Sequence, residues 1–524
     1  MKKPAPQASP PAPSPGGAMS AGLRRYLYFT ALVTGAAVLV VEILGAKMLS
    51  PYVGTSHFVW TAQIAVTLMS LATGYYLGGR LADRSQNLSR LFVCLLGAGV
   101  CLAFSVNLCR PVAFWALQYR LAAGALIAST FLFFLPLTLL ATTGPFLIRV
   151  FTTGVSSVGG NAGRLSAVST LGSVIGTVLI GYVLIPFLPN SWTMFLTSAS
   201  LLVLAVVYFL VWGKSKTGAI PVAVASAGLG FAGVHADLNS RFNNAEQLTR
   251  INSNFGELRV VDWKQRNERL YLNDGLFQNT YDPAEKKSES LFTYMLHGLA
   301  HAYSRKIDNV LCIGMGVGIV PMQFANEGVK TDVVEINPAI VPVAIRYFDL
   351  KPEKLNLSIG DGREFLNATK GQYDAVVLDA FLGDSTPAHL MTREAFTAMR
   401  DHLRPEGVLV INSFGDDLGP DFMTASLDKT LRAVFKNVRI HASGNGNIFF
   451  VASDQAELKI LNEYPVDQAH RVVQPQIKNA FNGLRTTDPA HGVVLTDDFN
   501  PVEFYDAQNR EKMRQSLAIF LRDL

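Results

Sequence analysis

The sequence is poor in cysteine, and the few cysteines are not arranged as a ligand set. Among 524 residues only Cys94, Cys101, Cys109 and Cys312 occur, and none forms a Cys-x-x-Cys pair. A disulfide framework or a cysteine-ligated zinc site is therefore not expected. We expect buried, unreactive thiols and no metal.

Acidic residues are nearly absent from the first half of the chain. Residues 1–235 carry 14 Lys/Arg against two acids, Glu42 and Asp83, whereas the remainder carries 31 basic and 38 acidic residues. The net charge of +5 is thus an average over two unlike parts. It gives no indication of nucleic-acid binding, and we expect none.

The basic half contains apolar runs long enough to cross a membrane. We predict a disordered Pro/Ala/Ser-rich tail over 1–24 and a transmembrane domain of six or seven helices over 25–235. The runs lie near 27–49, 58–79, 91–109, 122–148, 166–187 and 191–212, with a weaker Ala/Gly-rich run near 217–234. This pattern predicts a multi-pass protein in contact with the lipid bilayer.

Basic residues collect in the loops on the N-terminal side of these runs, which predicts a cytoplasmic N-terminus. Six crossings would return the chain to the cytoplasm, whereas seven would place the following domain outside. Nucleotide-type cosubstrates are cytoplasmic, and the run at 217–234 offers little insertion energy. The sequence therefore favours a cytoplasmic soluble domain, with the seven-span alternative left open.

The acidic half reads as two soluble parts. Residues 250–285 predict a small antiparallel sheet, with Asn273-Asp274-Gly275 as a turn. Residues 286–524 predict an α/β domain of Rossmann-like type, after helical spacing at 288–303, because apolar strands alternate with helices. We expect strands near 309–313, 331–335, 355–359, 374–379 and 407–412, and helices near 318–327, 338–347, 362–368, 392–402 and 422–434.

Four features fall at the carboxyl ends of successive predicted strands, where such sheets bind ligands. The first is a glycine loop, which lets backbone N–H groups approach a ligand at a helix start. Glu335 follows at a distance that suits the hydroxyls of a ribose, and Asp361 and Asp379 end the next two strands. Asp361 could alternatively cap a helix. The loop glycines are Gly314, Gly316 and Gly318, and no Lys-Ser/Thr of a phosphate-binding loop follows them.

These segments, in this order, resemble the spermidine synthase (polyamine aminopropyltransferase) family, and more closely its membrane-fused bacterial branch. The resemblance implies a location in a bacterial inner membrane. The resemblance implies that Gly314–Gly318 and Glu335 hold the nucleoside. It also implies that Asp361 and Gly362 bind adenine and that Asp379 deprotonates the attacking amine. Gln278 matches a glutamine that lines the substrate pocket.

The resemblance departs from the family in the amine half of the site. Val317 stands where the family has an aspartate facing the aminopropyl group, and Phe-Thr-Tyr at 292–294 replaces Tyr-His-Glu. The gate loop is rewritten as Asp379-Ala-Phe-Leu-Gly-Asp384-Ser-Thr-Pro387. Asp384 is nevertheless expected beside the cationic substrate, and the resemblance implies a homodimer.

The function implied is transfer of an aminopropyl group from decarboxylated S-adenosylmethionine to a polyamine or other amine. Val317 leaves open intact S-adenosylmethionine as cosubstrate, and with it another transferase reaction such as methyl transfer. A third possibility is a polyamine transporter or sensor whose soluble domain only binds.

Overall fold

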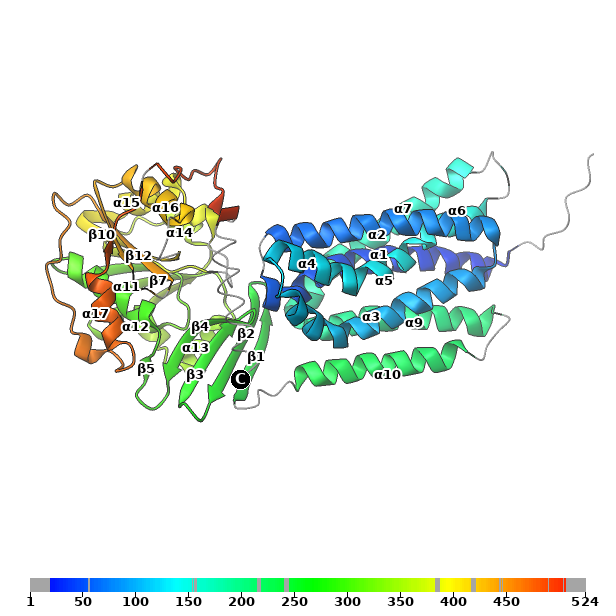
Figure 1. Ribbon diagram of the computed structural model, residues 1–524, viewed down its shortest axis with the longest axis horizontal. Helices are drawn as coiled ribbons and strands as arrows, with labels where there is room; N and C mark the ends of the chain where they lie inside the picture. The colour runs from blue at the N-terminus through cyan, green and yellow to red at the C-terminus, as the bar shows by residue number, and fades with distance from the viewer. Residues whose placement is uncertain are drawn as a thin grey trace, which may run out of the picture.

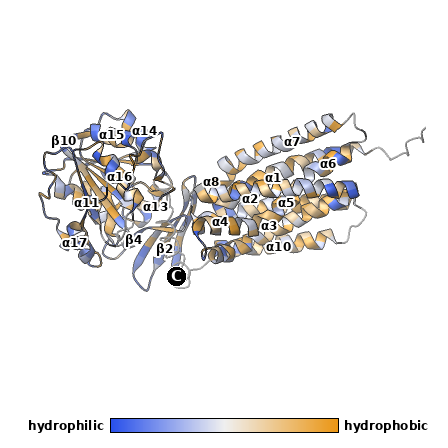
Figure 2. Ribbon diagram, turned by 45° about the horizontal axis from the view of Figure 1, so that its top comes forward, coloured by the Kyte–Doolittle hydropathy of each residue, from blue (hydrophilic) through white to orange (hydrophobic). Residues whose placement is uncertain are grey.

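The computed structural model describes residues 19–54, 57–152, 154, 158–213, 218–239, 245–381, 387–415, 421–442, 444, 446–488, 490–502 and 504–505. An elongated helical bundle forms one end of the molecule and an α/β part forms the other (Figure 1). Apolar residues make up much of the bundle (Figure 2), and large apolar side chains such as Leu68, Phe131 and Val203 are exposed on it.

The bundle contains seven helical segments that are long and apolar enough to cross a membrane, counted over the described residues. Two are irregular: Leu121–Phe151 and Val158–Phe187 each contain a π-helical stretch. The elements are α1 (Ala21–Val53), α2 (His57–Arg84), α3 (Leu88–Ala116), α4 (Leu121–Ser129), η1 (Thr130–Phe134), α5 (Leu135–Ala141), α6 (Thr143–Phe151), α7 (Val158–Leu179), η3 (Ile180–Leu184), α8 (Ile185–Phe187), α9 (Asn190–Val211) and α10 (Ala219–Leu238).

Small residues let α1 and α7 pack closely along their length. A Cβ at Gly172 would collide with the carbonyl oxygen of Leu32, and one at Gly176 would lie 2.6 Å from that of Ala36. Small residues at helix contacts are typical of membrane bundles, where close backbone approach supplies the packing energy.

The first helix begins earlier than the sequence predicts. The tail was expected to extend to residue 24, but α1 starts at Ala21, and the Ser20 hydroxyl accepts a hydrogen bond of 3.2 Å from the Leu23 N–H. The Ser20 cap satisfies one of the free N–H groups of the first turn. Residues 1–18 lie outside the described part.

The weak seventh run is a regular helix, α10, which packs against α3 and α9. Its last turn leads to the α/β part, which lies at the end of the bundle where α1 and α8 finish. A Cβ at Gly275 would lie 3.1 Å from the carbonyl oxygen of Pro51 in α1, so the turn approaches the end of α1 there. The α/β part and the start of α1 therefore lie at opposite ends of the bundle (Figure 1).

A five-stranded antiparallel sheet joins the bundle to the rest of the α/β part. Asn273-Asp274-Gly275 forms the tight turn between its third and fourth strands, with positive φ at Asp274 (46°) and Gly275 (76°), as a two-residue hairpin requires. The sheet covers a longer stretch of sequence than the expected 250–285, from Glu246 to Ser288. Its last strand includes residue 288, which the sequence assigned to a helix over 288–303. Its strands are β1 (Glu246–Ser253), β2 (Gly256–Trp263), β3 (Glu268–Asn273), β4 (Leu276–Asp282) and β5 (Lys287–Ser288).

The second sheet has eight strands in the order β13-β11-β12-β10-β9-β6-β7-β8. Its strands are β6 (Asn309–Ile313), β7 (Lys330–Glu335), β8 (Asn356–Ile359), β9 (Tyr373–Leu378), β10 (Leu403–Phe414), β11 (Asn437–Ala442), β12 (Asn447–Ser453) and β13 (Leu484–Arg485). The five strands predicted from the sequence are parallel to one another. β11 to β13 were not predicted from the sequence, and they add an antiparallel edge beside β10.

Helices cover both faces of this sheet (Figure 1). Along β6, Val310 and Cys312 face one hydrophobic core while Leu311 and Ile313 face the other, which explains the unbroken apolar run. The helices are α11 (Leu291–Tyr303), α12 (Ile319–Asn326), α13 (Ile340–Tyr347), α14 (Gly362–Ala368), α15 (Arg393–Asp401), α16 (Phe422–Arg432) and α17 (Gln474–Asn482), with short 3₁₀ turns η4 (Pro352–Lys354), η5 (Ala388–Leu390) and η6 (Val466–Gln468).

Candidate active site

The glycine loop connects β6 to α12 in a conformation that side chains would prevent. Gly314, Gly316 and Gly318 all have positive φ, of 91°, 53° and 88°. A Cβ at Gly314 would collide with the carbonyl oxygen of Asp379, whereas one at Gly316 would meet nothing within 4 Å. The loop is therefore packed against the end of β9 at Gly314 and open toward a cavity at Gly316.

Glu335 ends β7 directly beside this loop. One carboxylate oxygen accepts a hydrogen bond of 2.9 Å from the Met315 N–H, and the other accepts one of 2.8 Å from the Asn337 N–H. Burial raises the pKa of Glu335, although these backbone N–H groups act in the opposite direction. The carboxylate is thus held at the cavity wall with lone pairs still available to ligand hydroxyls.

The sequence left two alternatives for Asp361, a helix cap or a residue of the binding site. In the structure Asp361 caps α14 and also lines the cavity. Its Oδ1 accepts hydrogen bonds from the N–H groups of Arg363 (2.8 Å) and Glu364 (3.1 Å) at the start of α14. Its Oδ2 lies 2.8 Å from Nε2 of His389. Burial opposes ionisation of Asp361, but His389 and the backbone donors outweigh it, so its pKa is lowered.

Gly362 follows Asp361 at a point of tight packing. A Cβ there would lie 2.5 Å from Cγ2 of Ile313 on β6. The absence of a side chain lets the start of α14 approach the end of the central strand. Both Asp361 and Gly362 consequently line the same cavity as the glycine loop.

Asp379 directly follows β9, an interior strand, and so lies at the carboxyl-end edge of the sheet. Burial raises the pKa of its carboxyl group to about 6, and the charge of Glu335 acts in the same direction. A hydrogen bond of 2.9 Å from Nδ2 of Asn412 favours the ionised form and limits the shift. Nδ2 of Asn447 in turn donates to Oδ1 of Asn412 over 3.2 Å. A carboxylate with a pKa near 6 can accept a proton at neutral pH.

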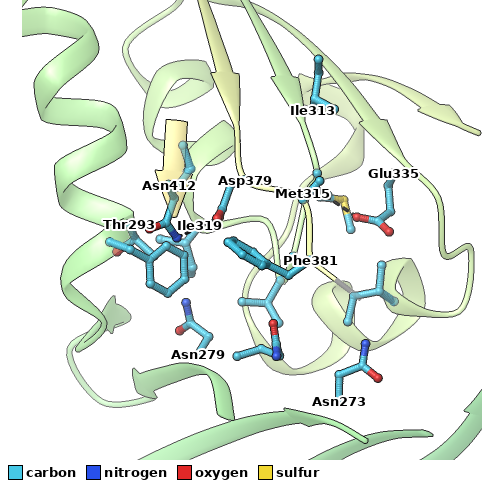
Figure 3. Close-up of a pocket in the computed structure, with 18 of the residues that line it drawn as sticks. Asn273, Asn279, Thr293, Ile313, Met315, Ile319, Glu335, Asp379, Phe381 and Asn412 are labelled. Carbon is cyan, nitrogen blue, oxygen red and sulfur yellow. Dashed lines mark hydrogen bonds between the residues drawn. The ribbon is translucent and has the colours of Figure 1, made fainter. Parts of the chain in front are cut away.

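These groups surround one cavity of about 380 Å³ between the two sheets. Figure 3 shows Asp379 beside Asn412 and Thr293 on one side, with Met315 and Glu335 on the other. The predicted residues Gly314, Gly316, Glu335, Asp361, Gly362, Asp379 and Gln278 all line it. Gly318 stands just behind the loop as the cap of α12, and Asp384 lies outside the described residues.

Several cavity residues were not found from the sequence. Asn412 ends β10 beside the strand of Asp379, a position from which a polar side chain could have been inferred. Glu289 comes from the β4–α11 connection, Asn279 from β4 and His389 from the 3₁₀ turn η5, and no sequence motif marks these positions. Val317, the main departure from the family, also lines the cavity and is only 3% exposed.

The cavity has the glycine loop, Glu335 and Asp361 as groups that could bind a nucleoside, and Asp379 as a carboxylate that could act as a base. Polar side chains such as Gln278 and Asn279 line the rest of it. No metal or charged acid is needed to expel a neutral leaving group from a sulfonium, so this geometry can support attack by an amine on an adjacent carbon. Burial of the reacting groups in one cavity provides the orientation on which such a displacement depends.

Comparison with known proteins agrees with this geometry. Residues 289–444 match the Spermine/spermidine synthase domain. The chain is similar to a polyamine aminopropyltransferase from Vibrio vulnificus, with 32% identity over 234 residues that cover 42% of this chain and 77% of that protein.

Two further relatives differ in how much of this chain they match. A polyamine aminopropyltransferase from Oceanobacillus iheyensis is 22% identical over 469 residues, which cover 84% of this chain and 88% of that protein. An N-terminal histidine N-methyltransferase from Emericella nidulans is 34% identical over 149 residues, or 28% of this chain and only 26% of that protein.

Proposed function

The chain belongs to the polyamine aminopropyltransferase (spermidine synthase) family, and we propose that it is a membrane-anchored transferase that moves an aminopropyl group from decarboxylated S-adenosylmethionine to an amine. The observation that carries this proposal is Asp379, a carboxyl group with a pKa of about 6. It lies in the same cavity as Glu335 and the glycine loop.

In the proposed reaction the amine nitrogen attacks the aminopropyl carbon that is attached to the sulfonium sulfur. The new N–C bond forms as the C–S bond breaks, and methylthioadenosine leaves as a neutral thioether. The proton of the attacking nitrogen passes to the carboxylate of Asp379. Because a free alkylamine is almost wholly protonated near neutral pH, the enzyme has to favour its neutral form, and this base provides the means.

The two sides of the cavity suit the two substrates. Glu335 and the open backbone at Gly316 would hold the ribose and the adenosyl group, with Asp361 toward the base. Like Gln278, Glu289 also lines the cavity. Its carboxylate would attract the second ammonium group of a diamine, since both substrates are cationic.

The test uses the purified full chain in detergent with decarboxylated S-adenosylmethionine and putrescine, cadaverine or spermidine in turn. Methylthioadenosine should form in stoichiometric ratio to the aminopropylated amine, and Asp379→Asn should abolish both. Absence of methylthioadenosine with all three amines would count against the proposal.

A second candidate is transfer of another group from intact S-adenosylmethionine, such as a methyl group. Two observations favour it: Val317 places no acid near the cosubstrate tail, and a methyltransferase is among the relatives. Adenosylhomocysteine formed from intact S-adenosylmethionine, without methylthioadenosine from the decarboxylated form, would identify this reaction.

We propose that the helical bundle spans the membrane and belongs to the membrane-fused branch of the family. The alignment to the Oceanobacillus iheyensis protein covers 84% of the chain, whereas residues 245–524 make up only about half of it. The shared sequence therefore extends into the bundle, and its seven apolar helices have the length that a bilayer requires.

Seven crossings would place the N-terminus and the α/β part on opposite sides. The basic residues within the described bundle favour the N-terminal end: Arg24, Arg25, Arg80, Arg84, Arg90, Arg149 and Arg164 against Lys47, Arg110 and Arg120. By the positive-inside rule we propose that the α/β part faces away from the cytoplasm. This orientation differs from the cytoplasmic soluble domain that the sequence favours. It requires the cosubstrate to be present on the side of the membrane away from the cytoplasm.

Reporter fusions on either side of α10 test this topology. Alkaline phosphatase, which is active only outside the cytoplasm, should be inactive after residue 213 and active after residue 239, with a fluorescent protein giving the reverse. If both fusion sites report the cytoplasm, α10 does not cross and the domain is cytoplasmic.

A further inference from the structure

Two histidines and a glutamate form a cluster in the α/β domain that is separate from the cavity lining. His297 and His301 lie four residues apart on α11, so their side chains share one face of that helix. Glu327 lies just past the last residue of α12 and faces them. None of the three lines the cavity.

The ligand atoms of this cluster converge on one point. Nε2 of His297 lies 3.0 Å from Oε1 of Glu327, and Nε2 of His301 lies 2.9 Å from Oε2 of the same carboxylate. The three side chains thus present two imidazole nitrogens and a carboxylate within 4.8 Å of one another. The two imidazole rings, with centroids 4.6 Å apart, stand edge to face.

The histidines are poorly satisfied by the protein itself. His297 is only 6% exposed, and its Nδ1 has no hydrogen-bond partner within the described part of the chain, while its Nε2 faces only the Glu327 carboxylate. The ring of Phe324 packs 4.6 Å from that of His297 and offers it no polar partner. A buried polar group without a partner costs free energy, and an ion would remove that cost.

We propose that His297, His301 and Glu327 bind one Zn²⁺ ion, with water in the remaining position. Imidazole and carboxylate are zinc ligands at ~2.1 Å, so the ligand atoms of a tetrahedral site lie ~3.4 Å apart. The observed separations of 2.9 and 3.0 Å need only a small opening of the side chains. The half-exposed Glu327 and the partly exposed His301 leave a path for water.

This site departs from the expectation of no metal, which rested on the cysteine pattern. The ligand set contains no cysteine. Glu327 lies 30 residues after His297 and 26 residues after His301 in the chain. A His-x-x-x-His pair on one helix was present in the sequence, but the glutamate that completes the set is brought to it only by the packing of α11 against α12.

The ion would act as a clamp rather than take part in the transfer reaction. The first turn of α11 supplies Phe292 and Thr293 to the cavity, and the first turn of α12 supplies Ile319 and Val320. The zinc ligands lie farther along the same two helices. The ion would therefore fix the spacing of the two helices whose first turns frame the substrates.

Zinc binding can be measured directly on the full chain in detergent after removal of any polyhistidine tag and of bound metal with a chelator. Equilibrium dialysis against Zn²⁺ followed by elemental analysis should give about one ion per chain. A competing chromophoric chelator gives the affinity. Loss of a ligand in His301→Ala should weaken binding at least ~100-fold, and Glu327→Gln at least ~10-fold.

Two control variants separate this site from others. His491→Ala removes an exposed histidine elsewhere on the domain and should leave the affinity unchanged. His470→Gln disrupts a second group, Asp282, Glu285 and His470, whose ligand atoms also converge, and should likewise change nothing. The Tm without zinc should be similar in wild type and His301→Ala, and zinc should raise it only in wild type.

Three outcomes would overturn the proposal. These are the absence of saturable binding at micromolar zinc, an affinity that His301→Ala and Glu327→Gln leave unchanged, or binding lost only in His470→Gln. None of these measurements depends on transferase activity, so the clamp and the proposed function can fail independently.

Discussion

Asn412 donates a hydrogen bond of 2.9 Å to the carboxylate of Asp379, and removing it should shift the pH range in which the protein is active. The perturbation is Asn412→Ala. The hydrogen bond favours the ionised carboxylate and opposes the effect of burial, so without it the pKa of Asp379 should rise above its value of about 6. The base has to be ionised to accept a proton, so activity is present above this pKa and is lost as the pH falls through it.

The magnitude follows from the strength of a hydrogen bond to a charged group, ~1.5–3 kcal/mol. Water that enters the vacated space replaces part of it, so the lower end applies, which corresponds to ~1 pKa unit. Asp379 would then be half ionised near pH 7. At pH 6 the ionised fraction falls about 5-fold relative to wild type, whereas at pH 8 it changes by only about 10%.

The assay is methylthioadenosine release, measured as kcat/KM from pH 5 to pH 9. The ratio of variant to wild type is the informative quantity, because ionisation of the free amine affects both proteins equally and cancels. We expect this ratio to be about 5-fold lower at pH 6 than at pH 8. Asn437→Ala, which removes an amide that bonds to the Gln455 carbonyl far from the cavity, is the matched control. A ratio that does not vary with pH would refute the role of Asn412 in setting the pKa of Asp379.

The other predictions concern stability and substrate binding. Asp379→Asn should raise Tm at pH 8 and only about half as much at pH 5. A folded-state pKa near 6 against an ordinary 3.8 means that ionising this group in the fold costs about 3 kcal/mol at pH 8, and this cost is lost as the pH falls from 6 to below 3.8; equal Tm differences at both pH values in thermal unfolding would contradict this. Glu335→Gln should raise KM for the cosubstrate ~10–100-fold with a smaller change in kcat, since it weakens charged hydrogen bonds to the ribose; steady-state kinetics in which only kcat falls would exclude that role. Val317→Asp should raise the preference for decarboxylated over intact S-adenosylmethionine ~10-fold relative to Val317→Asn, because the new carboxylate attracts the ammonium group. Calorimetric titration with both forms measures this preference, and equal effects of the two variants would argue against it. Glu289→Gln should raise KM for a diamine ~10-fold and leave that for a monoamine unchanged, a contrast that vanishes if Glu289 does not face the second ammonium group.

Local patterns were sufficient for the central part of the fold. The strand Asn309–Ile313 and the helix Gly362–Ala368 match their predicted ranges, because apolar runs and an Asp-Gly start mark their ends directly. β11 to β13 were missed, since an antiparallel edge strand carries no glycine loop or following helix to identify it. The N-terminal tail was drawn too long because the Ser20 cap precedes the first strongly apolar residues.

The candidate site divides in the same way. The glycine loop, Glu335, Asp361 and Asp379 could be placed from the sequence because parallel strands bring their carboxyl ends to one sheet edge. The pKa of Asp379, its bond from Asn412 and the position of Glu289 depend on side chains contributed by distant segments. No spacing rule relates residue 379 to residue 289.

The sequence by itself determined that a basic, apolar half precedes an acidic α/β domain, and that this domain carries the strand-end pattern of an adenosyl-binding transferase. Both follow from interactions within short windows, namely hydropathy, glycine conformations and strand periodicity. Tertiary structure alone decided how burial tunes Asp379, that α10 leads to the end of the bundle remote from Ala21, and that Glu327 meets His297 and His301. These depend on which surfaces pack together over long sequence separations, and burial and proximity exist only once that packing has formed.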